Sequence, residues 1–411
     1  MLKKILNVAV VLGLLLSLGA MTVSAAPAAQ KEITYTIKLG DSLWMLAEKY
    51  LGSGPAYWAI VGATNTKHGE DESFAKIDFP SLIHPGWKIL IPSAEKAEAF
   101  LKARPIKVGQ VTDVGGIDDR SFNQTAWNGA QLANERLGCP IAYLESQEMA
   151  DYEPNINEFL GQGYDLIVTV GFMLGDATAK AAKANPDTMF AIVDFFYDPV
   201  IPNVKGLTFA TDEAAFLAGY LAAAMSKTGK VGVFGGIEIP PVTIFMVGFE
   251  SGVKYYNQKH GTGVEVLGMN LFTGNFESTD DGRRMAESMM DEGVDVIMPV
   301  AGPVGLGTAA ACQEREAMMI GVDTDWYISA PEYKETYLTS VLKNMDVAVF
   351  ETALAVQSGT FEGGTWLGTL KNKGVGIAPF HNYEELVPPE IRADLETIKG
   401  GIIAGTIDTG W

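Results

Sequence analysis

The feature of this sequence that most constrains its fold is an alternation of short apolar runs with helical patterns throughout residues 105–411. Parallel strands that are buried on both faces form such continuous apolar runs, and the helices between them cover the sheet. The runs fall into two series, so we expect an α/β fold of two lobes with parallel sheets. The expected strands are 106–112, 141–145, 165–170, 189–193 and 206–209, then 230–234, 264–268, 294–298, 318–322 and 338–342.

The two series are similar where each begins. Val108-Gly109 to Gly115-Gly116-Ile117 is echoed by Val231-Gly232 to Gly235-Gly236-Ile237. Two such lobes place a cleft between them, where the carboxyl ends of the strands face each other and where small molecules bind. We expect the chain to cross between the lobes near residues 210, 342 and 375, so that hinge bending closes the cleft.

A smaller unit, residues 32–92, precedes the two lobes and has a strand-helix-helix-strand pattern. Asp41 or Ser42 is the expected N-cap of its first helix, and the second helix is expected to end near Asn65. The unit resembles a LysM domain over its whole length, a small α+β fold. The matching residues are Tyr35-Thr36-Ile37, Gly40-Asp41-Ser42-Leu43, Ala47, Tyr50, Asn65, Pro85-Gly86 and Ile91-Pro92.

This resemblance implies binding to glycans that contain N-acetylglucosamine, usually peptidoglycan. The alternative is a LysM fold that is kept only as a spacer, and the segment 66–82 is longer than is usual for the family. Residues 93–104 are rich in helix formers and are expected to be a partly helical, semi-rigid linker.

The first 26 residues have the organisation of a secretory signal peptide. Lys3 and Lys4 precede an apolar core at 5–18, and Val23-Ser24-Ala25 resembles a cleavage site. A membrane anchor is the alternative, but the apolar run is shorter than the roughly 20 residues that a span needs. We therefore expect export and cleavage, with the mature protein in the cell wall or on the extracytoplasmic face of the cell membrane.

The net charge and the positions of the cysteines and histidines argue against nucleic-acid, anionic-lipid and metal binding. The net charge of −20 argues against nucleic acid or anionic lipid as partner, because phosphate binders concentrate Lys and Arg. The two cysteines, Cys139 and Cys312, are expected to be buried thiols, and the four histidines are too scattered for a metal site. We expect neither a metal nor a cofactor.

Residues 105–411 resemble the basic membrane protein family of substrate-binding proteins, which serve purine-nucleoside ABC importers. The resemblance implies a two-lobed, type I periplasmic-binding-protein-like fold, a nucleoside ligand (inosine, guanosine or adenosine) and an ABC permease as partner. Family members are commonly lipoproteins, whereas this chain has a LysM-like unit near its start. The matching segments begin with Asp113-x-Gly-Gly-Ile-Asp-Asp-Arg-Ser-Phe-Asn-Gln and include 151–155, 164–172, 190–194, 216–220 and 320–325.

A nucleoside has a flat base, a polar base edge and two adjacent ribose hydroxyls. Phe122 is expected to stack on the base, unless it is a core residue, and Asn123 to bond the base edge. Asp194 ends a buried strand, where a carboxylate needs a partner such as a purine N–H. The resemblance supports binding roles for Asp113, Phe122, Asn123, Asp194, Asp323 and Lys343.

Three of these residues have further expected roles or alternatives. Asp113 either contacts the ligand or orders its turn. Asp323 is expected to accept from the ribose diol, and Lys343 to pair with Asp323 while it donates to a sugar oxygen. Two more candidates depend on position: Phe245 as a second stacking ring, with a helix-core place beside Phe249 as the alternative, and Gly302, where backbone can approach the ligand.

Two motifs suggest other functions. Asp113-x4-Asp118-Asp119 is similar to the calcium-binding start of nucleoside hydrolases, but Gly115 stands where those enzymes have another Asp. We interpret Asp118 and Asp119 as turn and N-cap carboxylates, and the chain as a receptor without enzymatic activity. Gly302-x-x-Gly305-x-Gly307 lacks the Lys-Ser/Thr of a phosphate loop and is expected to be a turn at the cleft rim. The remaining alternatives are a receptor of the same fold for a sugar or a signalling nucleoside, and a cell-wall enzyme or adhesin.

Overall fold

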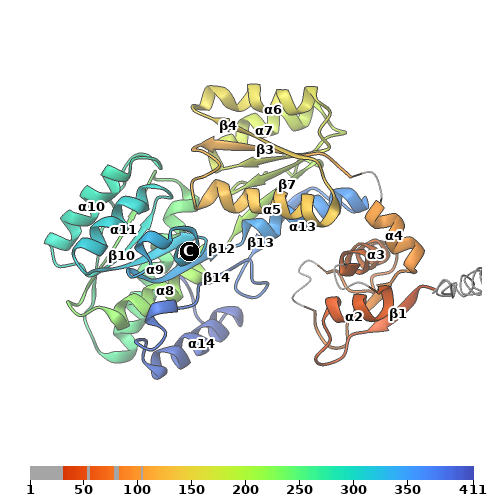
Figure 1. The fold of residues 1–411 in the computed structure, drawn as a ribbon. Coiled ribbons are helices and arrows are strands. Elements are labelled where there is room, and N and C mark those ends of the chain that lie inside the picture. Colours follow the sequence, from red (N-terminus) through yellow and green to blue (C-terminus); the bar gives the residue numbers. More distant parts are fainter. Residues whose placement is uncertain (1–30, 53–55, 78–82, 103–104) are drawn as a thin grey trace, which may run out of the picture.

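The computed structural model describes residues 31–52, 56–77, 83–102 and 105–411. The expected signal peptide, residues 1–26, lies outside these ranges. Within them, no helix combines the length and apolar character that a membrane crossing requires. The described chain forms two α/β lobes and a small N-terminal unit, described at 31–52, 56–77 and 83–92, with a linker after it (Figure 1).

Lobe 1 is built on a parallel six-stranded sheet in the order β13-β7-β6-β5-β3-β4. All five strands that the sequence predicts for this lobe are present. The central strands β3, β5 and β6 are buried on both faces, whereas the edge strand β4 is partly exposed. The sixth strand, β13, comes from a segment that follows α13, much later in the chain, and was not predicted. The strands are β3 (Val108–Val114), β4 (Ile141–Ser146), β5 (Leu166–Val170), β6 (Met189–Val193), β7 (Val204–Phe209) and β13 (Gly364–Gly368).

Lobe 2 repeats this arrangement in the order β14-β12-β11-β10-β8-β9. Its five predicted strands are parallel, and the unpredicted β14 pairs antiparallel with β12 at one edge. The two sheets therefore have matching strand orders, as the repeat in the sequence indicates. The strands are β8 (Lys230–Gly235), β9 (Glu265–Leu267), β10 (Val296–Val300), β11 (Met318–Asp323), β12 (Tyr337–Lys343) and β14 (Val375–Ile377).

Helices cover both sheets. In lobe 2 the long helices α8 and α9 pack so closely that a Cβ on Gly219 would lie 2.0 Å from the carbonyl oxygen of Phe249. The helices of lobe 1 are α5 (Phe122–Leu137), α6 (Tyr152–Gly161), α7 (Gly175–Ala184) and α13 (Met345–Ser358). Those of lobe 2 are α8 (Thr211–Met225), α9 (Pro240–His260), α10 (Thr279–Asp291), α11 (Val304–Glu314), α12 (Trp326–Ser329) and α14 (Pro389–Ile403).

The chain passes between the lobes three times, where the sequence predicts it. It leaves lobe 1 after β7, returns after β12 to form α13 and β13, and crosses again to β14. Because α13 packs on α5, the first helix of lobe 1 is held by a segment that comes directly from lobe 2. Three adjacent crossings of this kind suit a hinge.

The N-terminal unit has the predicted strand-helix-helix-strand order. Its strands β1 (Ile33–Thr36) and β2 (Lys88–Ile91) pair antiparallel, and α2 (Leu43–Leu51) has Ser42 as N-cap, with Oγ accepting from the Met45 amide. The prediction that the second helix ends near Asn65 is wrong, because α3 runs over Tyr57–Glu70. Asn65 lies inside this helix, and its side chain makes two hydrogen bonds to the backbone of Ile77, which follows the helix.

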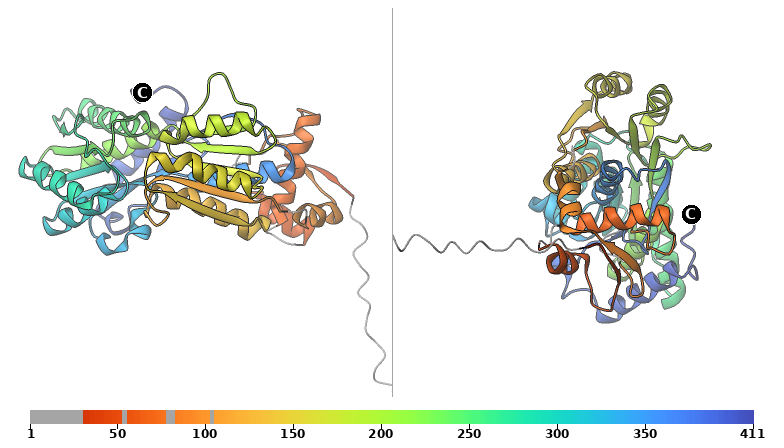
Figure 2. Two further views of the ribbon diagram at one scale, coloured as in Figure 1. Left: turned by 90° about the horizontal axis from the view of Figure 1, so that it is seen from above. Right: turned by 90° about the vertical axis from the view of Figure 1, so that its right-hand side faces the viewer.

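This unit lies against lobe 1 and away from lobe 2 (Figures 1 and 2). The linker forms helix α4 (Ala94–Lys102), as its composition indicates. Trp58 of α3 packs on Phe350 of α13 with ring centroids 4.2 Å apart, and both side chains are buried. The N-terminal unit therefore has its own hydrophobic contact with lobe 1 in addition to the linker.

Candidate functional site

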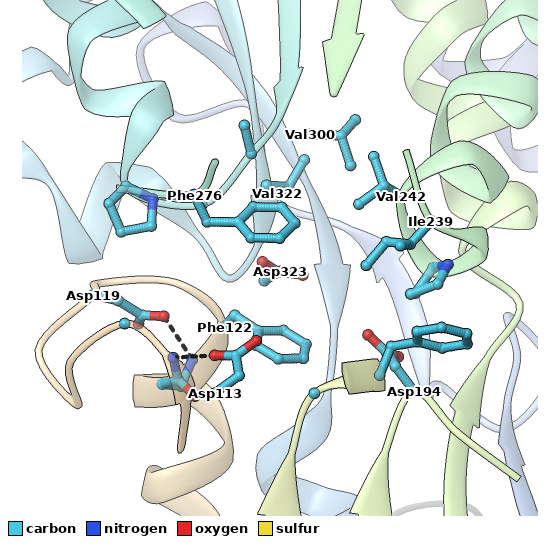
Figure 3. Close-up of a pocket in the computed structure, with 18 of the residues that line it drawn as sticks. Asp113, Asp119, Phe122, Asp194, Ile239, Val242, Phe276, Val300, Val322 and Asp323 are labelled. Atoms are coloured by element: carbon cyan, nitrogen blue, oxygen red, sulfur yellow. Dashed lines mark hydrogen bonds between the residues drawn. The ribbon is translucent and has the colours of Figure 1, made fainter. Parts of the chain in front are cut away.

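A pocket lies between the two lobes at the carboxyl ends of the central strands, with about 660 Å³ of empty space including its mouth (Figure 3). Lobe 1 contributes the ends of β3, β5 and β6 with the start of α5, and lobe 2 those of β10 and β11 with the start of α9. The structure brings all eight predicted residues to its walls: Asp113, Phe122, Asn123, Asp194, Phe245, Gly302, Asp323 and Lys343.

The amide of Asn123 is half satisfied. Its Nδ2 donates to Asp113 Oδ1 at 3.1 Å, while its Oδ1 is buried and accepts no hydrogen bond from any residue in the described ranges. A buried carbonyl oxygen without a donor is costly, so this atom is suited to a donor on a ligand. Asp113 therefore orders its turn by bonding Asn123 and also lines the pocket.

Asp119 organises the start of α5. Its carboxylate accepts from the backbone amides of Ser121, Asn123 and Gln124 at 2.9, 2.7 and 3.0 Å. These are amides that a helix leaves unbonded at its N-terminus. Asp119 therefore caps the helix from two residues before the N-cap position, which Ser121 occupies, whereas Asp118 is exposed to solvent.

Burial dominates the electrostatics of the pocket. It raises the pKa of Asp113 to about 8, against the hydrogen bond from Asn123, and the pKa of Asp119 to about 6, against the three amides. Burial also raises the pKa of Asp194 and of Asp323, and the charge of Lys343 opposes both shifts. The pocket thus concentrates four carboxyl groups around one ammonium group.

Lys343 forms a buried ion pair with Asp194, whose Oδ2 lies 2.5 Å from Nζ. The prediction that Lys343 pairs with Asp323 is therefore wrong: Asp323 Oδ2 accepts instead from Ser121 Oγ at 2.8 Å. The reason is tertiary, since β12 enters the hinge and directs the Lys343 side chain to lobe 1. Nζ also lies 4.8 Å from the centroid of the Phe122 ring.

Three of the phenylalanine side chains that line the pocket differ in how far they are buried. Phe122 begins α5 and is partly exposed to the pocket, so it is not an enclosed core residue. Phe245 lines the pocket but is buried in the core with Phe249, which is the helix-core alternative; its role as a second stacking ring stays a prediction. Phe276 lines the pocket without having been predicted, and its ring lies across from that of Phe122 (Figure 3).

No pattern in the sequence singles out Phe276. It lies in an irregular loop between β9 and α10, which follows neither a strand nor a helix period. The loop is shaped by the side chain of Asn275, which accepts from the amides of Glu277 and Ser278. Only the folded loop brings the Phe276 ring to the pocket.

Of the motif Gly302-x-x-Gly305-x-Gly307 in lobe 2, only the first glycine lies in a turn at the pocket. Gly302 has φ of 53° and lines the pocket, as predicted. Gly305 and Gly307 lie inside α11, so placing them in the rim turn is wrong. They permit close packing instead: a Cβ on Gly307 would lie 1.7 Å from the Thr279 carbonyl oxygen, and one on Gly305 would lie 2.8 Å from the Trp326 ring.

The described residues contain no cluster of His, Cys, Asp and Glu side chains arranged to hold a metal ion. Cys139 and Cys312 are free and buried, and burial raises the pKa of each thiol to about 12. Both are therefore inert thiols, as the sequence predicts.

The family model for ABC transporter substrate-binding proteins of the PnrA-like type, Bmp, matches residues 106–408. The chain belongs to this family. The family comprises binding proteins rather than enzymes, so the Bmp domain of this chain is the solute-binding component of an ABC transporter.

Relatives agree with this assignment. The ABC transporter nucleoside-binding protein BmpA of Lactococcus lactis is 34% identical over 72% of this chain and 88% of its own length. Basic membrane protein A of Borreliella burgdorferi is 33% identical over 72% of this chain and 85% of its own. Residues before 106, including the LysM-like unit, lie outside the family match.

Solved structures give the same fold. A solute-binding protein of an ABC transporter from Aeropyrum pernix shares 31% identity with a TM-score of 0.69, over 74% of this chain and 93% of its own. A second one, from Conexibacter woesei, shares 22% identity with a TM-score of 0.61, over 74% of this chain and 98% of its own. The Bmp domain therefore has the two-lobed, type I periplasmic-binding-protein fold.

Proposed function

We propose that this protein is an extracytoplasmic receptor that binds purine nucleosides in the pocket between its lobes and delivers them to an ABC permease. The observation that carries the proposal is the pair of rings, Phe122 and Phe276, that lie across from each other in the pocket. A purine base between two rings gains stacking energy on both faces. The nucleoside-binding relative at 34% identity supports the same ligand class.

On one side of the space between the Phe122 and Phe276 rings, the polar side chains are suited to bind the edge of a purine base. Asn123 Oδ1 lacks a donor, and the carboxyl of Asp113 lies beside it with its pKa raised to about 8 by burial. At neutral pH the Asp113 carboxyl is therefore largely protonated, so it can donate as well as accept. A purine edge, which presents both donors and acceptors, is complementary to these two side chains.

The opposite side suits a ribose. Asp323 and the ion pair of Lys343 with Asp194 offer carboxylate acceptors and an ammonium donor close together. Two adjacent hydroxyls can donate to a carboxylate and accept from Lys343. We therefore assign Asp323 and Lys343 to the sugar, with Asp194 holding the Lys343 ammonium group in place.

The N-terminal unit is proposed to be a LysM domain that holds the receptor in peptidoglycan. Leu39, Trp44 and Met45 are exposed around the turn between β1 and α2. Exposed apolar side chains of this kind suit the apolar face of a sugar ring. The proposed organisation is a signal peptide at 1–26, LysM at 32–92, a linker at 93–104 and the receptor at 105–411.

Calorimetric titration of the exported protein with inosine, guanosine and adenosine tests the nucleoside assignment. We expect saturable binding of at least one of them, with the ligand recovered unchanged by chromatography. Binding of glucose, galactose or a signalling nucleoside in their place would assign the pocket to another ligand. Release of free base would contradict a receptor without enzymatic activity.

A further inference from the structure

Two neighbouring residues of lobe 1 reach across to lobe 2 beside the pocket. Ser121 Oγ donates to Asp323 Oδ2 at 2.8 Å and also lies 3.3 Å from the carbonyl oxygen of Val322. Arg120 forms an ion pair with Glu332, which is half exposed. We call these four side chains, Arg120, Ser121, Asp323 and Glu332, the clasp.

Ser121 is fixed firmly in lobe 1. Its amide donates to Asp119 Oδ1, and its carbonyl oxygen accepts from the amide of Thr125 at 3.0 Å. Its side chain is fully buried. The hydroxyl therefore has a set position relative to α5, and its bond to Asp323 depends on where lobe 2 lies.

The side chain of Asp323 has fewer hydrogen bonds to fix its position than Ser121 has. It ends β11 with φ of 69°, and Ser121 is the one side chain in the described ranges that donates a hydrogen bond to its carboxylate. Lys343, which would otherwise be its cation, bonds Asp194. The second oxygen of Asp323 is thus the free acceptor of a carboxylate that lobe 1 steadies through a single hydroxyl.

We propose that Ser121 is a positioning residue that makes sugar recognition conditional on closure of the lobes. When the lobes meet, its hydroxyl fixes one oxygen of Asp323 and directs the other to the ligand; when they part, the carboxylate loses this orientation. The exposed Arg120–Glu332 ion pair also stabilises the closed arrangement at the rim of the pocket. Because solvent screens this pair, the buried hydrogen bond of Ser121 contributes more to that stabilisation. This inference rests on the proposed function for the identity of the ligand.

The test compares a purine nucleoside with its 2′,3′-dideoxy analogue in Ser121→Ala and wild-type protein. Loss of closure weakens both ligands alike, so we expect the variant to weaken nucleoside binding about tenfold more than it weakens analogue binding, because only the nucleoside hydroxyls use the oriented Asp323 carboxylate. Ser146→Ala is the matched control, since Ser146 is also fully buried and bonds Asn155 within lobe 1. Equal weakening of both ligands, or of neither, would overturn the inference.

A second measurement tests, in ligand-free protein, whether the clasp holds the two lobes together. Both native cysteines are buried, so spin labels at Asp187→Cys in lobe 1 and Asn270→Cys in lobe 2, both exposed positions, report the separation of the lobes. We expect Ser121→Ala to shift the distance distribution to longer values and Ser146→Ala to leave it unchanged. An unchanged distribution in Ser121→Ala overturns the clasp, whereas a wild-type protein that binds no nucleoside overturns the proposed function alone.

Discussion

Asp194 and Asp323 hold equivalent places in the two lobes. Asp194 directly follows β6 and Asp323 ends β11, and these strands occupy the same position in the order of their sheets. Both residues have left-handed backbone, with φ of 67° and 69°. Such a conformation is unfavourable for a residue with a Cβ and is held by its surroundings, which is typical of functional positions. The duplicated fold thus directs one carboxylate into the pocket from each lobe.

The ion pair of Lys343 with Asp194 is predicted to be essential to the folded pocket. Their side chains are 2% and 7% exposed, so Lys343→Met leaves a carboxylate buried without its cation. We expect the free energy of unfolding to fall by about 3–5 kcal/mol, measured by urea denaturation. Lys180→Met removes an ion pair of 69% and 49% exposure and should cost less than about 1 kcal/mol. Similar losses in both variants would contradict the role of burial.

Stability of the ligand-free protein is predicted to decline as pH rises. Burial raises the pKa of Asp113 to about 8 from 3.8, so the folded protein holds this proton more tightly than the unfolded chain does. The resulting contribution is fully present below pH 3.8 and is lost as the pH rises through 8. Asp119, with its pKa raised to about 6, acts in the same direction over a narrower range.

Asp113→Asn isolates this effect, because an amide cannot ionise. Urea denaturation between pH 5 and pH 8, a window below the raised pKa of about 8, should show wild type losing stability relative to the variant. The slope should not exceed about 1.4 kcal/mol per pH unit, the limit for one proton. Parallel pH profiles for the two proteins would show that Asp113 is ionised throughout.

Phe276 is predicted to contribute to ligand affinity as much as Phe122. Phe276→Ala and Phe122→Ala should each weaken nucleoside binding by about 1–3 kcal/mol in calorimetric titrations, because each removes one face of the stack. Phe196→Ala is the control, since Phe196 is exposed and lies outside the pocket lining. Wild-type affinity in Phe276→Ala would leave the base stacked on one side only.

Binding to the cell wall is predicted to depend on the N-terminal unit. Trp44 is 45% exposed beside the turn between β1 and α2, so Trp44→Ala should reduce retention on insoluble peptidoglycan severalfold in a sedimentation assay. Trp411→Ala removes an indole of similar exposure, 59%, at the far end of the chain and should bind as wild type does. If wild-type protein itself does not sediment with peptidoglycan, the unit is a spacer.

The sequence by itself determined the architecture and most of the pocket. Apolar runs such as 166–170 are typical of buried strands in a covered sheet, and the central strands of both sheets follow from that rule. The carboxyl ends of parallel strands meet at one edge of each sheet. This brings Asp113 and Asp194 together in lobe 1, and the facing of the two edges across the cleft brings Asp323 to them from lobe 2. Local chemistry also limited the cap of α2 to Asp41 or Ser42 and indicated a capping role for Asp119, because such side chains act within a few residues.

Only the tertiary structure decided how the side chains are partnered. Lys343 bonds Asp194 and Ser121 bonds Asp323 because the hinge strand and the two lobes bring together residues more than a hundred positions apart. Phe276 reaches the pocket from a loop without periodicity, and β13 joins a sheet whose other strands lie far earlier in the chain. Sequence periodicity records which face of an element is buried, whereas the partner across that face depends on how the finished sheets and lobes are placed.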